Sequence, residues 1–423
     1  MINIIDLFSG AGGLTEGFRN QQYKILGHVE KEKAACETLK LREAYYYLKE
    51  KNKLGLYSDF LNSKTSIEDL LKPVPQEKLN KILNFEISQE NIHSIFSFFD
   101  DLEEHVDGII GGPPCQAYST IGRARNASKK YSDERIYLYK FYIHFLNKYQ
   151  PKFFIFENVK GLLSFRDADD EFLLPRMKKE FEEAGYSLGY EVLNTKNYGV
   201  PQSRERLIIF GVVNEKKELI QEFFKNLKKY EENEVDVKTA FQGLPSLRAG
   251  EVNNSYTNLS NDYVEQNFLQ DSKTPLTQNI ARPNNSNDLA IYKIVAEAKK
   301  NGRNIKYSDL DSRLKTHKHT DKFLDRFKAL SWDSPSHTVV AHISKDGHHY
   351  IHPDTKQNRS ITVREAARLQ GFPDDFKFVV ADTHLYKQFG NSVTVSVIEA
   401  IAKKIKKVLE LQDNKRERKK HYA

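Results

Sequence analysis

The chain has 423 residues, and at about 150 residues per domain this length predicts two or three domains. With 39 % hydrophobic and 12 % aromatic residues, the composition excludes disordered and fibrous proteins. The two cysteines exclude a disulfide framework and a cysteine-based zinc site, and the net charge of +7 is compatible with a polyanionic partner.

The apolar patterns also bear on where the protein works. The longest apolar runs, such as Leu207–Val213, are too short to cross a bilayer, so no membrane contact is expected. Residues Met1–Asp6 read as a first β-strand and lack the basic segment, long apolar stretch and cleavage site of a signal peptide. These patterns predict a cytoplasmic protein.

The first half of the chain alternates strand-like and helical patterns. Short β-branched and aromatic runs predict strands at Ile2–Phe8, Tyr23–Val29, Gly108–Ile110, Phe153–Phe156 and Leu207–Val213. Helical patterns lie between them, for example at Leu14–Asn20 and Tyr137–Lys148. This alternation predicts a doubly wound, mostly parallel α/β sheet, in which ligands bind at the carboxyl ends of the strands. The long segment Lys31–Asn91 is predicted to be an insertion, and no chemistry is assigned to it.

A glycine-rich turn follows the first predicted strand. In Asp6–Leu14, Gly10, Gly12 and Gly13 join a strand to a helix, a turn that brings backbone amides close to a ligand. The next strand ends in Glu30, 20 residues after Gly10, and an acid at this spacing can accept the ribose hydroxyls of an adenosine. A solvated strand end is the alternative for Glu30. No Walker lysine follows the glycines, so a phosphate is not the implied ligand.

Cys115 is the candidate nucleophile. It follows a predicted strand in the sequence Gly111-Gly112-Pro113-Pro114-Cys115-Gln116, where two prolines fix the backbone just before the thiol. A cysteine held rigidly at a strand end is better explained as a nucleophile than as a core residue. Cys36, in contrast, is interpreted as a buried core residue. The stretch 118–130 carries Arg123 and Arg125, and it indicates either a loop that closes over a phosphate backbone or an ordinary basic surface loop.

A carboxylate and two arginines are the other candidate catalytic groups. Glu157 directly follows the apolar run Phe153–Phe156, where its pKa can be raised so that it acts as an acid; a capping or salt-bridged glutamate is the alternative. Arg204 and Arg206 stand on one face as a strand begins. They can hold a carboxylate, a carbonyl or a phosphate, or form surface salt bridges.

The second half of the chain is more polar. Residues 250–287 are rich in Asn, Ser and Thr, which indicates either surface loops or a recognition surface. Helical patterns return at Leu289–Lys300, from Val363, and at Val395–Leu411, whose apolar face requires a partner. Seven of the 13 histidines fall between His317 and His352, but in no spacing typical of a metal site, so no metal is expected.

Together these segments resemble the DNA cytosine-5 methyltransferase family, in its bacterial modification-enzyme form. The resemblance runs from end to end, and its motifs stand in the family's usual order. They are the S-adenosylmethionine loop at Asp6–Gly13, the Pro-Cys motif at Gly111–Gln116, the Glu-Asn-Val motif at Glu157–Val159, the Gln-x-Arg-x-Arg motif at Gln202–Arg206, the motif after the recognition domain at Arg364–Phe376 and the closing motif at Gly390–Val393. The least clear match is Asn91-Ile92, which stands where the family usually has Asp-Ile.

The resemblance implies a fold and a set of binding residues. The fold is that of an S-adenosylmethionine-dependent methyltransferase, with a catalytic domain at 1–238, a smaller target-recognition domain at 239–358, and a segment at 359–423 that returns to the first sheet near Ile4 and Leu14. The implied cofactor is S-adenosyl-L-methionine. Its implied contacts are Phe8 with the adenine, Glu30 with the ribose, Asn391 near the methionine end, and Gly10, Gly12, Ile92 and Pro113. The implied DNA contacts are Gln116, Ser119, Arg123 and Arg125.

The implied reaction is methyl transfer to carbon 5 of a cytosine flipped out of a specific double-stranded DNA sequence. Cys115 is the nucleophile, Glu157 the acid and Arg206 the contact to the cytosine carbonyl, while Arg204 braces the site. We expect a monomer, and enzymes of this kind are often partnered with a restriction endonuclease that acts on the same site. The alternatives are a tRNA cytosine-5 methyltransferase and a non-catalytic DNA-binding regulator. The long segment Gly211–Arg364 favours duplex DNA as the substrate.

Overall fold

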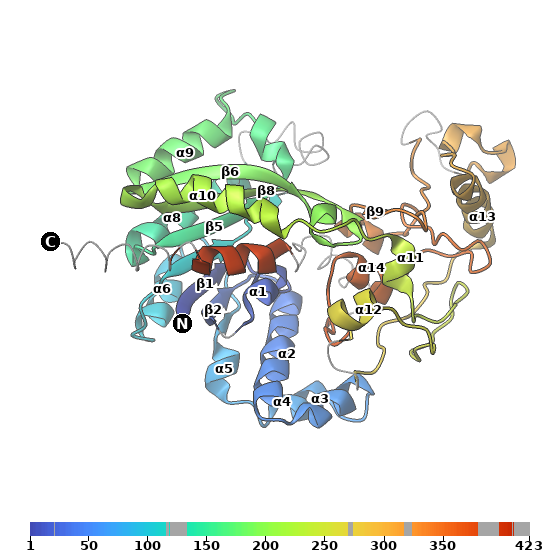
Figure 1. Ribbon diagram of the computed structural model, residues 1–423, viewed down its shortest axis with the longest axis horizontal. Helices are drawn as coiled ribbons and strands as arrows, with labels where there is room; N and C mark the ends of the chain where they lie inside the picture. The colour runs from blue at the N-terminus through green and yellow to red at the C-terminus, as the bar shows by residue number, and fades with distance from the viewer. Residues whose placement is uncertain are drawn as a thin grey trace.

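The computed structural model describes residues 1–20, 22–115, 118, 133–269, 274–316, 324–379, 397–407 and 409. A larger lobe is built around a sheet, and a smaller lobe lies beside it (Figure 1). The sheet contains seven strands among the described residues: β1 Ile2–Leu7, β2 Tyr23–Val29, β3 Ile82–Leu83, β4 Gly108–Gly111, β5 Phe153–Asn158, β6 Tyr186–Asn194 and β8 Glu205–Val213. Their order is β3-β2-β1-β4-β5-β8-β6. Neighbours from β3 to β5 pair in parallel, and β8 runs antiparallel to β5 and β6, which confirms the predicted mostly parallel α/β sheet.

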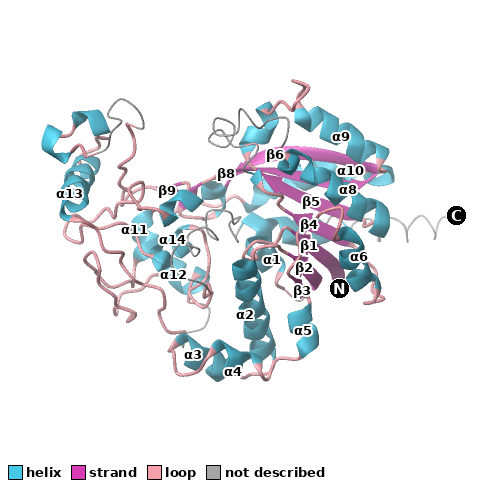
Figure 2. Ribbon diagram, turned by 180° about the vertical axis from the view of Figure 1, so that it is seen from behind, coloured by secondary structure: helices cyan, strands magenta, loops and turns pink. Residues whose placement is uncertain are grey.

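Helices cover both faces of the sheet (Figure 2). One face packs against α6 Ile92–Asp100, α8 Leu138–Tyr149 and α9 Leu173–Glu183. The other packs against α1 Gly13–Phe18, α10 Glu218–Leu227 and the helical residues 397–407. Every residue of β5 is buried, which is typical of a central strand with both faces covered and explains its unbroken apolar run.

The helical residues 397–407 return to the beginning of the chain. Val397, Ile398 and Ile401 lie in the same apolar cluster as Ile4 and Leu14. The contact is close, because a Cβ on Gly17 of α1 would lie 2.6 Å from the side chain of Ile398. The apolar face at 3.6-residue spacing therefore packs where the sequence predicts.

The segment between β2 and β4 is more than the predicted insertion. It contains α2 Lys33–Glu50, α3 Leu54–Leu61, α4 Ile67–Leu71 and α5 Gln76–Asn80, but it also contains β3, which pairs with β2 at the edge of the sheet. A strand of two residues is too short to show an alternating pattern. The strand β6 at the other edge was also missed, although the alternation of Tyr186, Leu188 and Tyr190 with Ser187, Gly189 and Glu191 is the pattern of a half-buried strand.

The smaller lobe has little regular structure. Its elements are α11 Val237–Phe241, α12 Asp262–Asn267, α13 Ser286–Lys300, β9 Ser336–His337 and α14 Val363–Leu369, and β9 pairs with the short strand β7 Gln202–Ser203. One apolar cluster joins α11, α12 and α14, and a second surrounds α13. Over the described ranges, no helix is long and apolar enough to span a membrane.

Candidate active site

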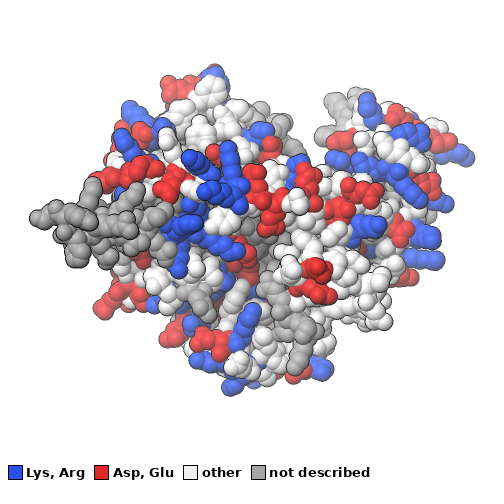
Figure 3. Space-filling view, in the orientation of Figure 1, with Lys and Arg blue, Asp and Glu red and all other residues white. Residues whose placement is uncertain are grey.

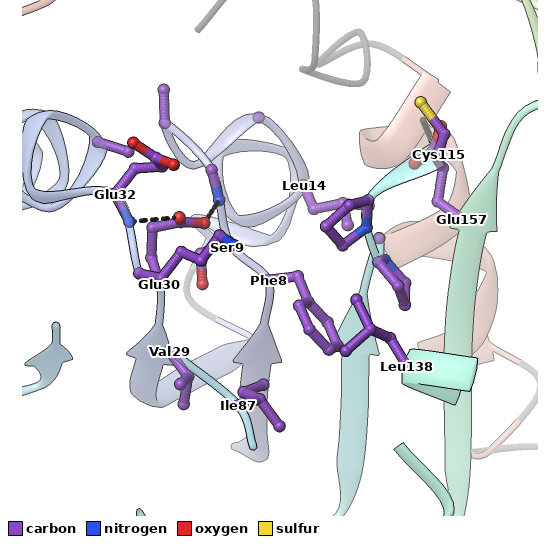
Figure 4. Close-up of a pocket in the computed structure, with 18 of the residues that line it drawn as sticks. Phe8, Ser9, Leu14, Val29, Glu30, Glu32, Ile87, Cys115, Leu138 and Glu157 are labelled. Carbon is purple, nitrogen blue, oxygen red and sulfur yellow. Dashed lines mark hydrogen bonds between the residues drawn. The ribbon is translucent and has the colours of Figure 1, made fainter. Parts of the chain in front are cut away.

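A cavity of about 310 Å³ opens where the carboxyl ends of neighbouring strands meet. Each of these strands contributes a wall residue just at or beyond its end. They are Phe8 after β1, Glu30 after β2, Ile87 beyond β3, Cys115 beyond β4 and Glu157 near the end of β5. Glu30 lies at one end of the cavity and Cys115 with Glu157 at the other (Figure 4). The topology of the sheet thus brings Glu30 and Glu157, which are 127 positions apart in the sequence, to the same cavity.

The turn after β1 has a backbone that only a few residues adopt readily. Gly10 and Gly12 have φ values of 55° and 89°, and Phe8 has a φ of 57°. This turn aims the ring of Phe8 into the cavity (Figure 4). Gly10 lies on the cavity wall, whereas Gly12 faces α2, where a Cβ would lie 2.8 Å from the side chain of Leu39.

The Glu30 carboxylate is held by backbone amides. One oxygen accepts a hydrogen bond of 2.8 Å from the N–H of Gly10, and the other accepts one of 2.8 Å from the N–H of Glu32 (Figure 4). Burial raises the pKa of Glu30, and these two N–H groups oppose that rise. Each oxygen keeps a second lone pair, so the oriented carboxylate can still accept hydroxyl donors.

The structure corrects the prediction for Ile92. Ile92 opens α6 and is buried in the core, and it is not among the described residues that line the cavity. Phe85, Glu86 and Ile87, which follow β3, line the cavity instead. The family's Asp-Ile pair is an acidic residue followed by isoleucine. In this chain Glu86-Ile87, just after β3, has that pattern and lines the cavity. Because β3 lies within the supposed insertion, the prediction fell five residues after Ile87, at the first residue of α6.

The loop that carries Cys115 is fixed at several points. A Cβ on Gly112 would lie 2.7 Å from Oε2 of Glu157, so a side chain there would displace the Glu157 carboxylate. The amide of Asn158 donates a hydrogen bond of 3.3 Å to the carbonyl of Pro113, and the N–H of Tyr118 donates one of 3.0 Å to the carbonyl of Cys115. Pro113 lines the cavity as well. The thiol is thus presented by a backbone with little freedom.

Glu157 and Arg206 meet because of the direction of β8. Since β8 is antiparallel to β5, its first residues lie at the carboxyl end of β5, and Asn158 pairs with Leu207. Nε of Arg206 lies 2.8 Å from Oε1 of Glu157. Burial raises the pKa of Glu157 although Arg206 and Arg204 lower it. Burial also raises the pKa of the Cys115 thiol, the charge of Glu157 adds to that rise, and the two arginines oppose it.

Arg204 lies behind the cavity. It is fully buried and absent from the described lining, and its Nη1 donates a hydrogen bond of 2.7 Å to the carbonyl of Val339. Burial and the neighbouring Arg206 lower the pKa of Arg204 to about 9. The side chain of Gln202 accepts a hydrogen bond of 2.9 Å from the N–H of Val339 and donates one of 3.0 Å to the carbonyl of Leu369. These two side chains connect the larger lobe to the smaller one.

Several predicted site residues lie outside the described residues. They are Gln116, Ser119, Arg123, Arg125 and Asn391. A group of three His, Cys, Asp or Glu side chains placed to hold a metal ion does not occur in the described ranges.

A family model for C-5 cytosine-specific DNA methylases matches residues 2–55 and 74–407. The chain belongs to this family. The type II methyltransferase M.Bpa9945I of Bacillus paralicheniformis is 38 % identical over 445 residues, covering 96 % of this chain and 99 % of that protein. The type II methyltransferase M.FnuDI of Fusobacterium nucleatum is 29 % identical, covering 96 % and 95 %.

Solved structures agree on the fold of this C-5 cytosine-specific DNA methylase. A protein assigned as a DNA modification methyltransferase encoded within a prophage (E. coli) superposes with a TM-score of 0.63 at 24 % identity, covering 97 % of this chain and all of that one. The Dnmt2 methyltransferase of S. pombe superposes with a TM-score of 0.52 at 15 % identity, covering 97 % and 99 %. The resemblance drawn from the sequence motifs is therefore confirmed, and the protein is a DNA cytosine-5 methyltransferase of the type II modification kind.

Proposed function

We propose that this methylase transfers a methyl group from S-adenosyl-L-methionine to carbon 5 of a cytosine flipped out of a specific double-stranded DNA sequence. The observation that carries the proposal is the division of the cavity into two ends. Glu30 and apolar side chains form one end, and Cys115, Glu157 and Arg206 form the other. A cofactor and a base held at these two ends would meet in one enclosed space.

The residues at the first end fit an adenosine. Glu30 would accept the ribose hydroxyls, because its carboxylate is already oriented by two backbone amides. Phe8, Phe85 and Ile87 offer apolar faces to the adenine, with Gly10 and Pro113 nearby on the same wall. S-adenosylmethionine supplies an electrophilic sulfonium methyl group when it is bound. Asn391 remains our proposal for the methionine end.

The residues at the second end fit the activation of cytosine. The Cys115 thiolate would form a bond to carbon 6, and the electron pair of the 5,6 double bond would make carbon 5 nucleophilic. The proton of Glu157 would stabilise the charge that develops at ring N3, and Arg206 would hold both Glu157 and the cytosine carbonyl. Carbon 5 would take the methyl group, leaving the cofactor as a neutral thioether. Loss of the carbon 5 proton to solvent would then return an electron pair to the ring, and the bond between Sγ and carbon 6 would break. Arg204 would brace this end from behind.

We assign target recognition to residues 239–358, and phosphate contacts to Gln116, Ser119, Arg123 and Arg125. Basic side chains gather over the smaller lobe around α13, as Figure 3 shows. The exposed ones include Lys293, Lys300, Arg303, Lys306 and Arg313. Such a surface suits the negatively charged DNA backbone. We further propose that the enzyme acts as a monomer, and that a restriction endonuclease with the same target is its partner.

Sequencing of host DNA for 5-methylcytosine, with and without the gene, tests this function. We expect methylation at one short sequence that disappears when the gene is removed. Exchange of residues 239–358 for the same segment of a relative with another target should move the methylated sequence with it. Methylation confined to tRNA, or a chimera that keeps the original target, would overturn the proposal.

Replacement of Phe85 by alanine should weaken cofactor binding. Phe85 is 39 % exposed at the cavity wall, where an adenine would cover it. Loss of an aromatic face that covers a base should raise the dissociation constant of S-adenosylmethionine roughly ten-fold. Isothermal titration without DNA measures this constant. Phe172 is 45 % exposed and does not line the cavity, so the Phe172→Ala variant is the matched control and should bind the cofactor normally.

A further inference from the structure

The helices α2 and α3 meet the chain that follows α14, far along the sequence. Nη1 of Arg42 donates a hydrogen bond of 2.8 Å to Oδ1 of Asp375, and the hydroxyl of Tyr45 donates one of 2.6 Å to Oδ2. The hydroxyl of Tyr57 on α3 donates one of 2.8 Å to the carbonyl of Asp375. Side chains of Arg42 and Asp375 are only 6 % and 4 % exposed, so this ion pair is screened little by water.

The neighbouring residues 376–379 are held by the same helices. The N–H of Val379 donates a hydrogen bond of 3.0 Å to Oγ1 of Thr38 on α2. Nζ of Lys377 lies 4.4 Å from the ring centre of Phe60 on α3. Two turns of α2 and one face of α3 therefore contact the continuous segment 375–379.

The opposite side of this stretch belongs to the smaller lobe. Asp374 accepts hydrogen bonds from Arg368, the shortest at 2.6 Å, and one of 2.8 Å from the hydroxyl of Tyr256. The N–H of Asp374 donates one of 2.9 Å to the carbonyl of Phe268. The side chain of Gln278 bonds both the N–H and the carbonyl of Phe378. The adjacent carboxylates Asp374 and Asp375 thus bind different lobes.

The ion pair also reaches the turn beside the cofactor end of the cavity. Nε of Arg42 lies 3.0 Å from both carboxylate oxygens of Glu16, and Glu16 lies on α1, which begins directly after the glycine turn. The family model leaves out residues 56–73, which include Tyr57, Phe60 and all of α4. Part of this contact is therefore built from a segment outside the family pattern.

We propose that α2 and α3 form a brace that sets the orientation of the smaller lobe against the catalytic lobe, with Arg42 and Asp375 as its positioning residues. The proposal rests on the assignment of target recognition to the smaller lobe. Neither residue lines the cavity, so the brace acts through the placement of the lobe on DNA. Its loss should therefore weaken selection of the target sequence and leave the cofactor site intact.

The test uses the full-length enzyme with Asp375→Asn, which keeps the shape and removes the charge. We expect the KM for cognate DNA to rise roughly ten-fold, the usual scale for a lost charged hydrogen bond. Discrimination against a site with one changed base pair should fall with it, while kcat and the dissociation constant of S-adenosylmethionine without DNA should change less than two-fold. Tyr45→Phe and Thr38→Val should show smaller shifts of the same kind. Tyr47→Phe on the same helix is the matched control and should behave as the unaltered enzyme.

Two further results separate the explanations. If Asp375→Asn does not fold, the milder Tyr45→Phe and Thr38→Val variants decide, and an unchanged KM with unchanged discrimination in both overturns the brace. A lower melting temperature without any change in KM or discrimination would also overturn it, because it would mean stability alone. If the smaller lobe does not read the target, the chimera with residues 239–358 exchanged will keep the original methylated sequence, and this failure of the recognition assignment is visible before any brace variant is made.

Discussion

Replacement of Cys115 by serine is expected to abolish methyl transfer, with a loss of at least roughly 10³-fold, while specific DNA binding stays largely intact. A serine hydroxyl is a far weaker nucleophile than a thiolate, and the rigid loop through Pro113 and Pro114 would still present it to the same point. Methylation is measured with labelled cofactor and binding by gel shift. Cys36→Ser is the control, because Cys36 is buried and does not line the cavity, and the hydrogen bond of 3.3 Å from its Sγ to the carbonyl of Glu30 can be kept by a serine hydroxyl.

A trapping experiment checks the same assignment by another route. DNA with 5-fluorocytosine at the target should form a covalent adduct with the unaltered enzyme, because fluorine cannot leave as a proton does. Peptide mapping should find the adduct on Cys115. Full activity of the serine variant, or an adduct on another residue, would show that Cys115 is not the nucleophile.

Replacement of Glu157 by glutamine should lower kcat by roughly 10²-fold, the usual scale for loss of a general acid. The same change should make the thiol more reactive. The charge of Glu157 contributes to the raised pKa of Cys115, so removing it lowers that pKa and increases the thiolate fraction at pH 8. Alkylation by iodoacetamide should therefore accelerate at pH 8, with its pH profile shifted to lower pH.

A lower kcat together with faster alkylation distinguishes loss of a general acid from damage to the cysteine loop in the Glu157→Gln variant. Background alkylation of Cys36 stays low, because burial raises its pKa to about 12. If turnover and alkylation both fell, Glu157 would be needed for the integrity of the cysteine loop and not as an acid. If the affinity for S-adenosylmethionine collapsed, Glu157 would be a cofactor ligand.

The sequence predicted the central sheet and both ends of the cavity because their signals are local. The short aromatic and β-branched run Phe153–Phe156 favours a buried strand, and a cysteine held rigid by two preceding prolines indicates a nucleophile. Glu30 was found by its spacing from Gly10. Ile92 was wrong because β3, only two residues long, leaves no periodic signal, so the residues beyond it could not be placed.

The contacts between lobes could not be predicted at all. Asp375 and Arg42 are 333 positions apart, and nothing in either neighbourhood indicates the other. The arginines of the Gln-x-Arg-x-Arg motif look equivalent in sequence, yet Arg206 lines the cavity and Arg204 lies behind it. Alternation along a strand would put both side chains on one face, as expected from the sequence. That expectation was wrong, because Arg204 lies between β7 and β8 and belongs to neither strand.

Residues 202–204 form a joint with the smaller lobe, and each hydrogen bond of this joint has a backbone atom as one partner. Gln202 bonds the N–H of Val339 and the carbonyl of Leu369, and Arg204 bonds the carbonyl of Val339. The hydroxyl of Thr338 donates a hydrogen bond to the carbonyl of Ser203. A carbonyl or an N–H is the same whatever side chain it carries, so the joint tolerates sequence drift in the segment it holds. If residues 239–358 read the target, as we propose, such a joint lets that segment change its sequence while the catalytic residues keep their positions.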